Sequence, residues 1–322
     1  MIGHVVRLLG KACSVRPEPQ TDKLYECYLR GRLFETPGAQ IAVGDRVEFD
    51  PVEEPHSRDS VGAGTKKGIG VIHEILPRQT ALVRPPSKKR GKPQVVAANI
   101  HQLVVVSAIK QPQYKTGLID RYLVIAHRAG LVPILCMNKV DLASPEQRDK
   151  ADRDLNPYKE LGLASVFTSA VNGEGIEPLQ NLLKDKRSVL VGHSGVGKSK
   201  LAGRLQPGLT LSSSSVTRRG KGRHTTSAST LFPLDFGGEL VDTPGVRELS
   251  ISDLDQSELD EHFSEFESFL GNCRFTSCSH IPEPDCAVRE GVESGKISRA
   301  RYHSYVRLYH ELQHHRHTHR AR

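Results

Sequence analysis

The sequence of 322 residues contains no tryptophan, no internal repeat and no long apolar run. No stretch approaches the ~18 apolar residues that a membrane-spanning helix requires. The apolar run within residues 1–10 is also too short for the core of a secretory signal peptide. These absences lead us to expect a soluble, cytoplasmic protein without a membrane partner.

Cysteine is scarce, with six residues, and none of them forms a C-x-x-C pair. Because cytosolic proteins rarely keep disulfides, we do not expect cross-links. Cys273, Cys278 and Cys286 lie close together and enclose His280, and three thiolates with one imidazole are a donor set of structural zinc. Four protein ligands would close the site, which argues against a catalytic zinc. Buried free cysteines and an iron–sulfur cluster are the alternatives.

Acidic residues are fewer than basic ones, and the formal net charge is +8. Basic residues cluster at 88–92, at 218–223 and after Arg299. Such an excess suits a polyanion such as RNA, and an ordinarily solvated surface is the alternative. We expect the clusters at 88–92 and 218–223 to contact RNA.

The first part of the chain has the pattern of a small β-barrel. Candidate strands cover residues 3–9, 24–33, 45–49 and 70–76, and turns rich in Pro and Gly separate them. An OB-fold, which binds oligonucleotides on one face, is one candidate. The Pro- and Lys-rich residues 84–93 indicate a linker, so the first predicted domain covers residues 1–94.

Residues 100–243 alternate between strand-like and helix-like segments. Strands are expected at 102–108, 132–137, 166–169, 188–191 and 239–241, with helices such as 118–128 and 176–184 between them. This alternation predicts a mostly parallel sheet that binds ligands at the carboxyl ends of its strands. We assign residues 95–252 to this second domain.

The strand at 188–191 leads into G-x-x-x-x-G-K-S, the phosphate loop of nucleotide-binding proteins. The expected nucleotide contacts are Gly192, His193, Ser194, Gly195, Val196, Gly197, Lys198, Ser199 and Lys200. The glycines let backbone N–H groups turn towards phosphate oxygens. Lys198 is expected to reach the β- and γ-phosphates and Ser199 to bind Mg²⁺, so both are catalytic candidates. The alternative is a chance glycine-rich loop.

The strand at 132–137 is followed by N-K-x-D, the guanine-recognition motif of GTPases, at Asn138, Lys139 and Asp141. The Asp141 carboxylate can accept two N–H bonds from guanine, and a site of this type can reject adenine by roughly 10⁴-fold or more. Lys139 is expected to lie along the base and Asn138 to tie the loop together. Ser169 and Ala170 match the S-A element, in which the Ala170 N–H meets guanine O6.

The strand at 239–241 is followed by D-x-x-G. Asp242 is expected to hold Mg²⁺ through water, and the Gly245 N–H is expected to sense the γ-phosphate. Residues 218–226 occupy the place of switch I, the segment that supplies a further Mg²⁺ ligand. Thr225 or Thr226 is the candidate, and the sequence does not choose between them.

Ras-like enzymes orient the attacking water with a Gln directly after D-x-x-G. Here that position is Val246, whose side chain cannot form a hydrogen bond. We therefore expect slow intrinsic hydrolysis and take His224 in switch I as the candidate catalytic residue. A histidine that contacts RNA or solvent is the alternative.

The order of these motifs is unusual. Ordinary Ras-like GTPases carry the phosphate loop first and N-K-x-D last, whereas here N-K-x-D at 138–141 precedes the phosphate loop at 192–199. The sequence is therefore typical of a circularly permuted GTPase.

The last predicted domain covers residues 253–322. A helix is expected from Ser257, where Ser257-x-x-Asp260 is a capping signature, to Gly271. Its apolar face would carry Leu259, Phe263, Phe266 and Leu270, and its acidic face Glu258, Asp260, Glu261, Glu265 and Glu267. A second helix is expected at 296–313. Its Tyr302, Tyr305 and Tyr309 share one side, where core packing is favoured over stacking on RNA bases.

The combination of a barrel-like N-terminus, a permuted GTPase core and C-x4-C-x-H-x5-C resembles the bacterial RsgA family of small ribosomal subunit biogenesis GTPases, also called YjeQ or YloQ. The resemblance covers nearly the whole chain and includes G-R-H-T-T at 222–226. It implies an N-terminal OB-fold, GTP hydrolysis stimulated by the 30S subunit, and action late in 30S maturation. It also supports His224 as the catalytic histidine. Ser227 stands where relatives often have a third Thr.

We therefore predict a GTPase that converts GTP to GDP, with Mg²⁺ and one structural Zn²⁺. The expected partners are the 30S subunit and 16S rRNA, without DNA, and the expected state is a monomer. The segment after D-x-x-G leads directly into the zinc domain, so movement of Gly245 on loss of the γ-phosphate is expected to shift that domain. GTP is then expected to favour the 30S-bound state, and hydrolysis to favour release. The alternatives are an RNA-binding scaffold that uses GTP only as a structural ligand, a permuted GTPase of the large subunit and a P-loop nucleotide kinase.

Overall fold

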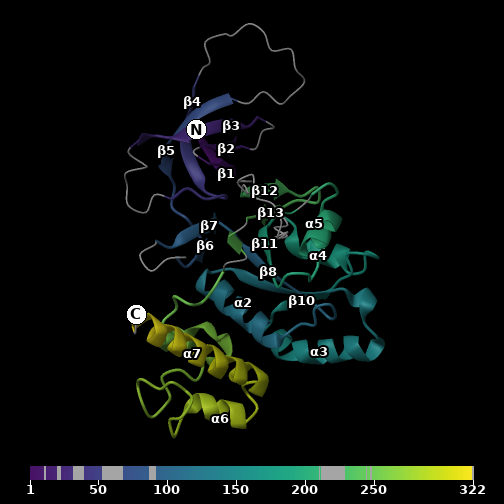
Figure 1. Ribbon diagram of the computed structural model, residues 1–322, viewed down its shortest axis with the longest axis vertical. Helices are drawn as coiled ribbons and strands as arrows, with labels where there is room; N and C mark the ends of the chain where they lie inside the picture. Colours follow the sequence, from purple (N-terminus) through teal and green to yellow (C-terminus); the bar gives the residue numbers. More distant parts are fainter. Residues whose placement is uncertain are drawn as a thin grey trace.

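The computed structural model describes residues 1–10, 12–19, 23–31, 40–52, 68–86, 92–209, 211, 229–243, 245–246 and 249–320, with side chains up to residue 314. A β-barrel, an α/β sheet and a helical C-terminal part follow one another along the long axis of the molecule (Figure 1). Among the described residues, no helix has both the length and the apolar character needed to cross a membrane.

Five strands form the N-terminal barrel. They are β1 (Ile2–Leu9), β2 (Ala12–Pro17), β3 (Tyr25–Leu29), β4 (Arg46–Val52) and β5 (Gly68–Ile75). Their order is β1-β2-β3-β5-β4, and β4 pairs back onto β1 to close the barrel. All these pairs are antiparallel except β3 with β5. The closed five-stranded topology confirms the predicted OB-fold.

The barrel core is small and lies between residues of all five strands. Val5, Cys27, Phe49 and Ile72 have no exposed surface. The strands predicted from the sequence did not include β2. Its alternation of Cys13 and Val15 with Ser14 and Arg16 covers only four residues, the shortest alternating run by which a half-buried strand is recognised.

The predicted linker at 84–93 joins two paired strands. β6 (Ala81–Arg84) and β7 (Gln94–Ala98) form an antiparallel hairpin, and Val43 of the barrel bridges to Ala97. The Pro-rich composition therefore marks a hairpin connection, whose residues 87–91 lie outside the described part of the chain. The division into residues 1–94, 95–252 and 253–322 stays a prediction.

The central sheet has five parallel strands and one antiparallel edge strand. The strands are β8 (Gln102–Ala108), β9 (Val132–Asn138), β10 (Ala164–Phe167), β11 (Arg187–Val191), β12 (Thr230–Pro233) and β13 (Glu239–Asp242). Their order is β10-β9-β8-β11-β13-β12, with β12 antiparallel to β13. The five predicted strands are present, β8 with the predicted bounds and β10 two residues earlier than predicted, whereas β12 was not predicted.

Helices cover both faces of this sheet. The helices are α2 (Thr116–Arg128), α3 (Pro145–Glu160), α4 (Ile176–Leu183) and α5 (Lys198–Leu205). Leu103 and Val105 of β8 share a core with α2 and α3, whereas Val104 and Val106 share the other core with α4 and α5. Successive residues of a strand point to opposite faces, so β8 is buried throughout. N-K-x-D, S-A, the phosphate loop and D-x-x-G lie at the carboxyl ends of the parallel strands β9, β10, β11 and β13, at one edge of the sheet.

The barrel and the central sheet are joined by the pairing of β1 with β12. Arg7 of β1 pairs with Thr230 of β12, which makes one continuous sheet. Arg187 of β11 is nearly buried and donates to the Glu239 carboxylate at 2.8 Å. It also donates to the Gly44 carbonyl oxygen at 3.0 Å. Arg16 of the barrel contacts the other oxygen of Glu239 at 2.9 Å.

The C-terminal part departs from the predicted helix at Ser257. Three short 3₁₀ turns replace it: η3 (Gln256–Glu258), η4 (Asp260–His262) and η5 (Ser264–Phe266). Asp255, not Ser257, caps the first turn by accepting a hydrogen bond from the Ser257 N–H. The predicted apolar side is confirmed, since Leu259, Phe263 and Phe266 are buried.

The predicted acidic face is wrong in two positions, because Asp260 and Glu265 have buried partners. Asp260 contacts His280, and Glu265 binds Arg301. Because these contacts hold Asp260 and Glu265, the segment does not form a regular α-helix. Two helices follow, α6 (Ala287–Glu293) and α7 (Arg299–Arg320). Helix α7 starts three residues later than predicted and continues beyond residue 313.

Candidate functional site: nucleotide pocket and cysteine–histidine cluster

The phosphate loop connects β11 to α5 in a backbone conformation that requires glycine. Gly192 and Gly197 have φ angles of 138° and 101°. A Cβ atom on Gly192 would lie 2.0 Å from the Val106 carbonyl oxygen, and one on Gly197 would lie 2.4 Å from the Asn138 side-chain nitrogen. Backbone approach of this kind is what glycine allows. The loop is therefore fitted against β8 and β9.

Three of the predicted phosphate and magnesium residues, Lys198, Ser199 and Asp242, line one pocket. Its lining consists of Leu190, Lys198, Ser199, Leu211, Val241, Asp242, Thr243 and Val246. The Lys198 ammonium group donates to the carbonyl oxygens of Gly192 and His193 at 2.6 and 2.9 Å, so it lies over the loop. A hydroxyl, a carboxylate and an ammonium group together suit a phosphate–Mg²⁺ pair.

Asn138 connects three loops at the carboxyl edge of the sheet. Its amide nitrogen donates to the Val196 carbonyl oxygen at 2.8 Å, and its amide oxygen accepts from the Thr168 hydroxyl at 3.2 Å and the Ala170 N–H at 3.3 Å. The side chain is 1% exposed. The N-K-x-D loop, the S-A loop and the phosphate loop are thereby held in one arrangement.

Lys139 and Asp141 of N-K-x-D lie at the surface where the three loops meet. Lys139 has a left-handed backbone with a φ of 63° and donates to the Gln111 carbonyl oxygen. The Asp141 carboxylate accepts a 2.6 Å hydrogen bond from the Ser169 hydroxyl. The S-A element and Asp141 therefore meet, as a base site formed by both would require. The Ala170 N–H, which was expected at guanine O6, is engaged here by Asn138.

Gly245, the last residue of D-x-x-G, and Val246 after it are packed against the protein. Val246 is 7% exposed and belongs to the core shared with α2 and α7. A Cβ atom on Gly245 would meet the Val96 side chain at 3.0 Å. The switch I candidates, His224 and Thr225 or Thr226, lie outside the described residues, as do the basic cluster at 218–223 and most of the cluster at 88–92.

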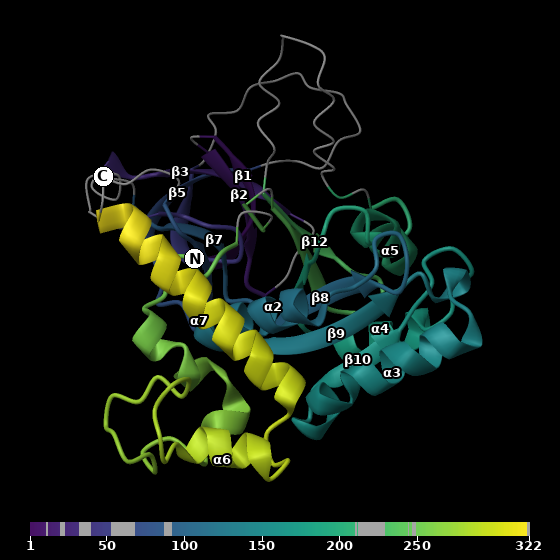
Figure 2. The ribbon, with the colours of Figure 1, turned by 60° about the horizontal axis from the view of Figure 1, so that its bottom comes forward.

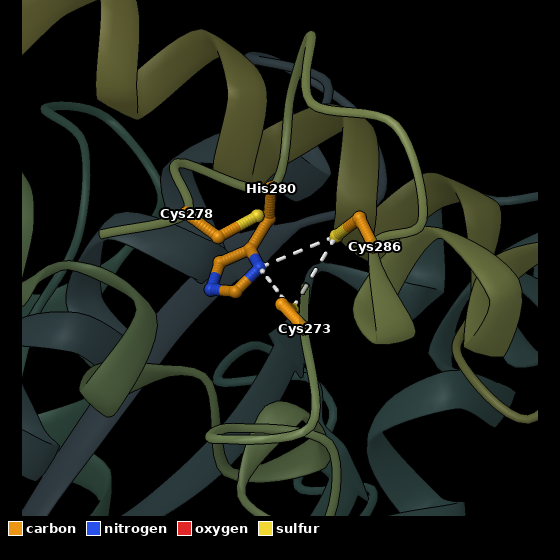
Figure 3. Close-up of side chains that lie close together, drawn as sticks. All are labelled: Cys273, Cys278, His280 and Cys286. Carbon is orange, nitrogen blue, oxygen red and sulfur yellow. Dashed lines mark hydrogen bonds between the residues drawn. The ribbon is translucent and has the colours of Figure 1, made fainter. Parts of the chain in front are cut away.

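The cysteine–histidine cluster forms as predicted (Figure 3). The Sγ atoms of Cys273, Cys278 and Cys286 and one ring nitrogen of His280 lie within 4.8 Å of one another. His280 Nδ1 is 3.4 Å from the Cys286 sulfur and 3.5 Å from the Cys273 sulfur. Tetrahedral zinc at 2.0–2.3 Å from each ligand produces ligand separations of roughly this size.

Asp260 orients the histidine of the cluster. Its carboxylate lies 3.1 Å from His280 Nε2, which leaves Nδ1 to face the sulfurs. A carboxylate behind a metal-binding histidine fixes the ring and its tautomer. The sequence analysis did not predict this role, because it assigned Asp260 to a helix cap. The sequence signal for the role is an acidic residue twenty positions before His280, and this spacing is not specific.

Two of the tyrosines on α7 close the loop that carries His280. The Tyr305 hydroxyl donates to the Ser279 carbonyl oxygen at 2.9 Å, and the Tyr302 hydroxyl donates to the His280 carbonyl oxygen at 2.8 Å. Tyr305 is 1% exposed. Packing, not base stacking, is therefore the structural role of this tyrosine pair, and the cluster is consistent with one structural zinc ion.

Comparison with known proteins agrees with the site. The profile of the RsgA GTPase family matches residues 75–252. A protein of Caldanaerobacter subterraneus subsp. tengcongensis named small ribosomal subunit biogenesis GTPase RsgA is 41% identical over 290 residues, which are 90% of this chain and 89% of the relative.

Two solved structures share the fold. The crystal structure of YjeQ from Thermotoga maritima has a TM-score of 0.78 and 35% identity, covering 97% of this chain and 98% of YjeQ. The structure of YloQ, described as a circularly permuted GTPase, has a TM-score of 0.74 and 28% identity, covering 97% and 94% of the two chains. With these matches, the chain belongs to the RsgA GTPase family of GTP hydrolases, which use GTP and Mg²⁺.

Proposed function

We propose that this protein hydrolyses GTP to GDP and phosphate during late maturation of the small ribosomal subunit in the cytoplasm. The observation that carries the proposal is the meeting of Asn138, Val196 and Ala170, which joins three nucleotide motifs in permuted order. Relatives that span most of this chain are named small ribosomal subunit biogenesis GTPases. The proposed partners are the 30S subunit and its 16S rRNA, bound by a monomer.

The roles of the individual residues follow from their places around the pocket. We assign the guanine base to Lys139, Asp141, Ser169 and Ala170, with Asn138 as the tie between loops. We assign the phosphates to residues 192–200, including Lys198. Mg²⁺ would be held by Ser199, by Asp242 through water, and by Thr225 or Thr226. Gly245 would respond to the γ-phosphate.

The catalytic step needs a group that positions water. Val246 is apolar and buried beside the pocket, so it cannot take this role. We assign the role to His224 of switch I. Hydrolysis would then depend on the placement of that histidine, and contact with the ribosomal subunit is the event that we expect to place it.

Hydrolysis is proposed to favour release from the subunit. GTP can hold the bound state only if that state has the higher affinity for GTP. Sedimentation with small subunits tests this: binding should be tighter with a non-hydrolysable GTP analogue than with GDP. Equal binding with both nucleotides would contradict the coupling.

An alternative function is that of an RNA-binding scaffold, which would hold GTP only as a structural ligand. Val246 in place of glutamine is the observation that favours it, and membership of a hydrolase family weighs against it. Phosphate release from many GTP molecules per protein in the presence of small subunits would exclude the scaffold. A single turnover or none would favour it.

A further inference from the structure

Helix α3 follows the N-K-x-D turn and lies beside β10, the strand that leads into the S-A loop. Figure 2 shows α3 next to β10, which is the last strand at one side of the central sheet. The helix begins with a capping box formed by Ser144 and Gln147. Arg148 is its fourth residue, where the helix dipole disfavours a positive charge. The Arg148 side chain therefore gains its stabilisation from contacts outside the helix.

Arg148 connects the N-K-x-D turn to the S-A loop. Its Nε and Nη2 atoms donate to the carbonyl oxygen of Val140, the variable residue of N-K-x-D, at 3.2 and 2.8 Å. Its Nη1 and Nη2 atoms donate to the two carboxylate oxygens of Glu174 at 2.7 and 3.1 Å. A guanidinium group can make these contacts together because its five N–H donors have a fixed planar arrangement.

The backbone fixes Glu174 beside the S-A element. The Ser169 N–H donates to the Glu174 carbonyl oxygen at 2.9 Å. Glu174 stands between Gly173 and Gly175, whose φ angles are 89° and 69°. A Cβ atom on Gly175 would lie 1.9 Å from the Phe167 carbonyl oxygen, an approach that glycine allows. The Glu174 side chain therefore starts from a fixed point in the S-A loop.

The contacts of Arg148 differ from those of an ordinary surface ion pair. The Arg148 and Glu174 side chains are 37% and 40% exposed, and an exposed pair alone contributes little to stability. These two side chains, however, join the loops that carry Asp141 and Ser169, which meet through a 2.6 Å hydrogen bond. Asn138 ties the same loops in the buried part of this junction.

We propose that Arg148 and Glu174 are positioning residues for guanine recognition. By holding the Val140 carbonyl group, Arg148 fixes the turn that carries Asp141 relative to the S-A loop. The Asp141 carboxylate is assigned to two donors of guanine, the N1–H and the exocyclic amino group, and such a paired contact depends on orientation as well as distance. This inference deepens the proposed function and rests on it, because it takes Asp141 as the residue that reads guanine.

The test compares GDP with inosine diphosphate, which lacks the exocyclic amino group of guanine. Fluorescent GDP is titrated into the zinc-loaded full chain, and each unlabelled nucleotide is then used to displace it. Arg148→Met should raise the Kd of GDP about threefold or more. The Kd of inosine diphosphate should rise less, because a single hydrogen bond tolerates a rotated carboxylate better than a pair does. The preference for GDP should therefore decrease.

Two further variants separate the clamp from charge alone. Glu174→Gln removes the charged acceptor and should decrease the preference for GDP as Arg148→Met does. Arg148→Lys keeps the charge but loses the fork, so it should not restore the wild-type preference. In the double variant Arg148→Met/Glu174→Gln, the two effects should be less than multiplicative, since both residues belong to one contact. Fully multiplied effects would contradict a shared clamp.

Lys159→Met is the matched control. Lys159 lies in the last turn of the same helix, its side chain is also 37% exposed, and it pairs with Asp152. This variant should keep both Kd values of the wild type. If Arg148→Met and Glu174→Gln weaken both nucleotides equally, or leave both Kd values unchanged, the proposal is overturned. Glu174→Gln alone decides the matter if Arg148→Met does not fold.

Failure of the proposed function has a different readout. A wild type that binds GDP and inosine diphosphate equally would contradict the assignment of Asp141 to guanine, and this inference would fall with it. A wild type that prefers GDP, with variants that keep the same preference, would contradict only the roles of Arg148 and Glu174. No ribosome is needed, so a lack of ribosomal stimulation would contradict the proposed function and leave this inference intact.

Discussion

The side-chain amide of Asn138 donates a 2.8 Å hydrogen bond to the carbonyl oxygen of Val196, and so binds the N-K-x-D loop to the phosphate loop. The two loops follow β9 and β11, which lie on either side of β8 in the sheet. Permutation changes the order of the motifs along the chain but keeps them at the same edge. The nucleotide site therefore depends on strand order in space.

Replacing Asn138 with alanine should weaken nucleotide binding by about tenfold or more, because the buried Val196 carbonyl and Ala170 N–H lose their partner. Titration with fluorescent GDP measures the effect. Asn172→Ala is the control: Asn172 accepts a hydrogen bond from the Glu174 N–H in an exposed part of the S-A loop. Equal losses of GDP affinity in both variants would contradict the proposed role of Asn138 in joining the loops.

Replacing Asp260 with asparagine should lower zinc affinity by about 10- to 100-fold, since the carboxylate that orients His280 is lost. Competition with a zinc-binding dye measures this affinity. Glu261→Gln is the control, because Glu261 is the exposed neighbour in the same turn. If purified protein holds no stoichiometric zinc, the zinc assignment itself is wrong, and a variant that ends before His314 excludes metal bound by the terminal histidines.

Replacing Arg187 with methionine should destabilise the chain by roughly 3 kcal/mol or more, because a nearly buried Glu239 and two backbone carbonyls lose a charged donor. Chemical denaturation, followed by circular dichroism, measures the loss. Arg46→Ala is the control, since its ion pair with Glu18 is exposed, and such pairs contribute little. An Arg187→Met variant as stable as the control would contradict the proposed role of this junction.

Replacing His224 with alanine should reduce ribosome-stimulated turnover by about 10²-fold or more while GTP affinity changes little, as expected for a group that places the attacking water. Stimulated hydrolysis and nucleotide titration should be compared in the same preparation. Unchanged turnover would remove His224 from catalysis. A parallel loss of affinity would indicate a binding role instead.

Neutralising the basic residues at 88–92 or 218–223 should weaken binding to small subunits and flatten its dependence on salt, because each lost phosphate contact removes about one unit of the logarithmic slope. Binding measured across a salt series checks this. Weaker binding with the same slope would mean that these residues do not contact phosphate. An equal number of substituted lysines and arginines on the solvent-facing side of α3 provides the control.

The sheet and its motifs were predictable because local rules decide them. β8 has seven buried residues in a row, of which only Gln102 and Ser107 are polar, and the phosphate loop needs glycine where its backbone meets Val106. The OB-fold was harder to predict, since the alternation of β2 covers only the four residues from Cys13 to Arg16. Its topology follows from the pairing of β3 with β5, a contact between distant segments.

The helix at Ser257 was predicted wrongly because long-range contacts override the local pattern. Ser257-x-x-Asp260 satisfies a capping rule, yet Asp260 turns to His280 and Glu265 to Arg301. Neither partner is recognisable from the sequence near residue 260.

The measurement that tests the central claim most directly is GTP hydrolysis at low protein concentration, alone and with purified 30S, 50S and 70S particles. The wild type should be slow alone and strongly stimulated by 30S particles, and Ser199→Ala should abolish the stimulation. Equal slow rates in every mixture, or stimulation by 50S particles instead, would contradict a GTPase that acts on the small subunit.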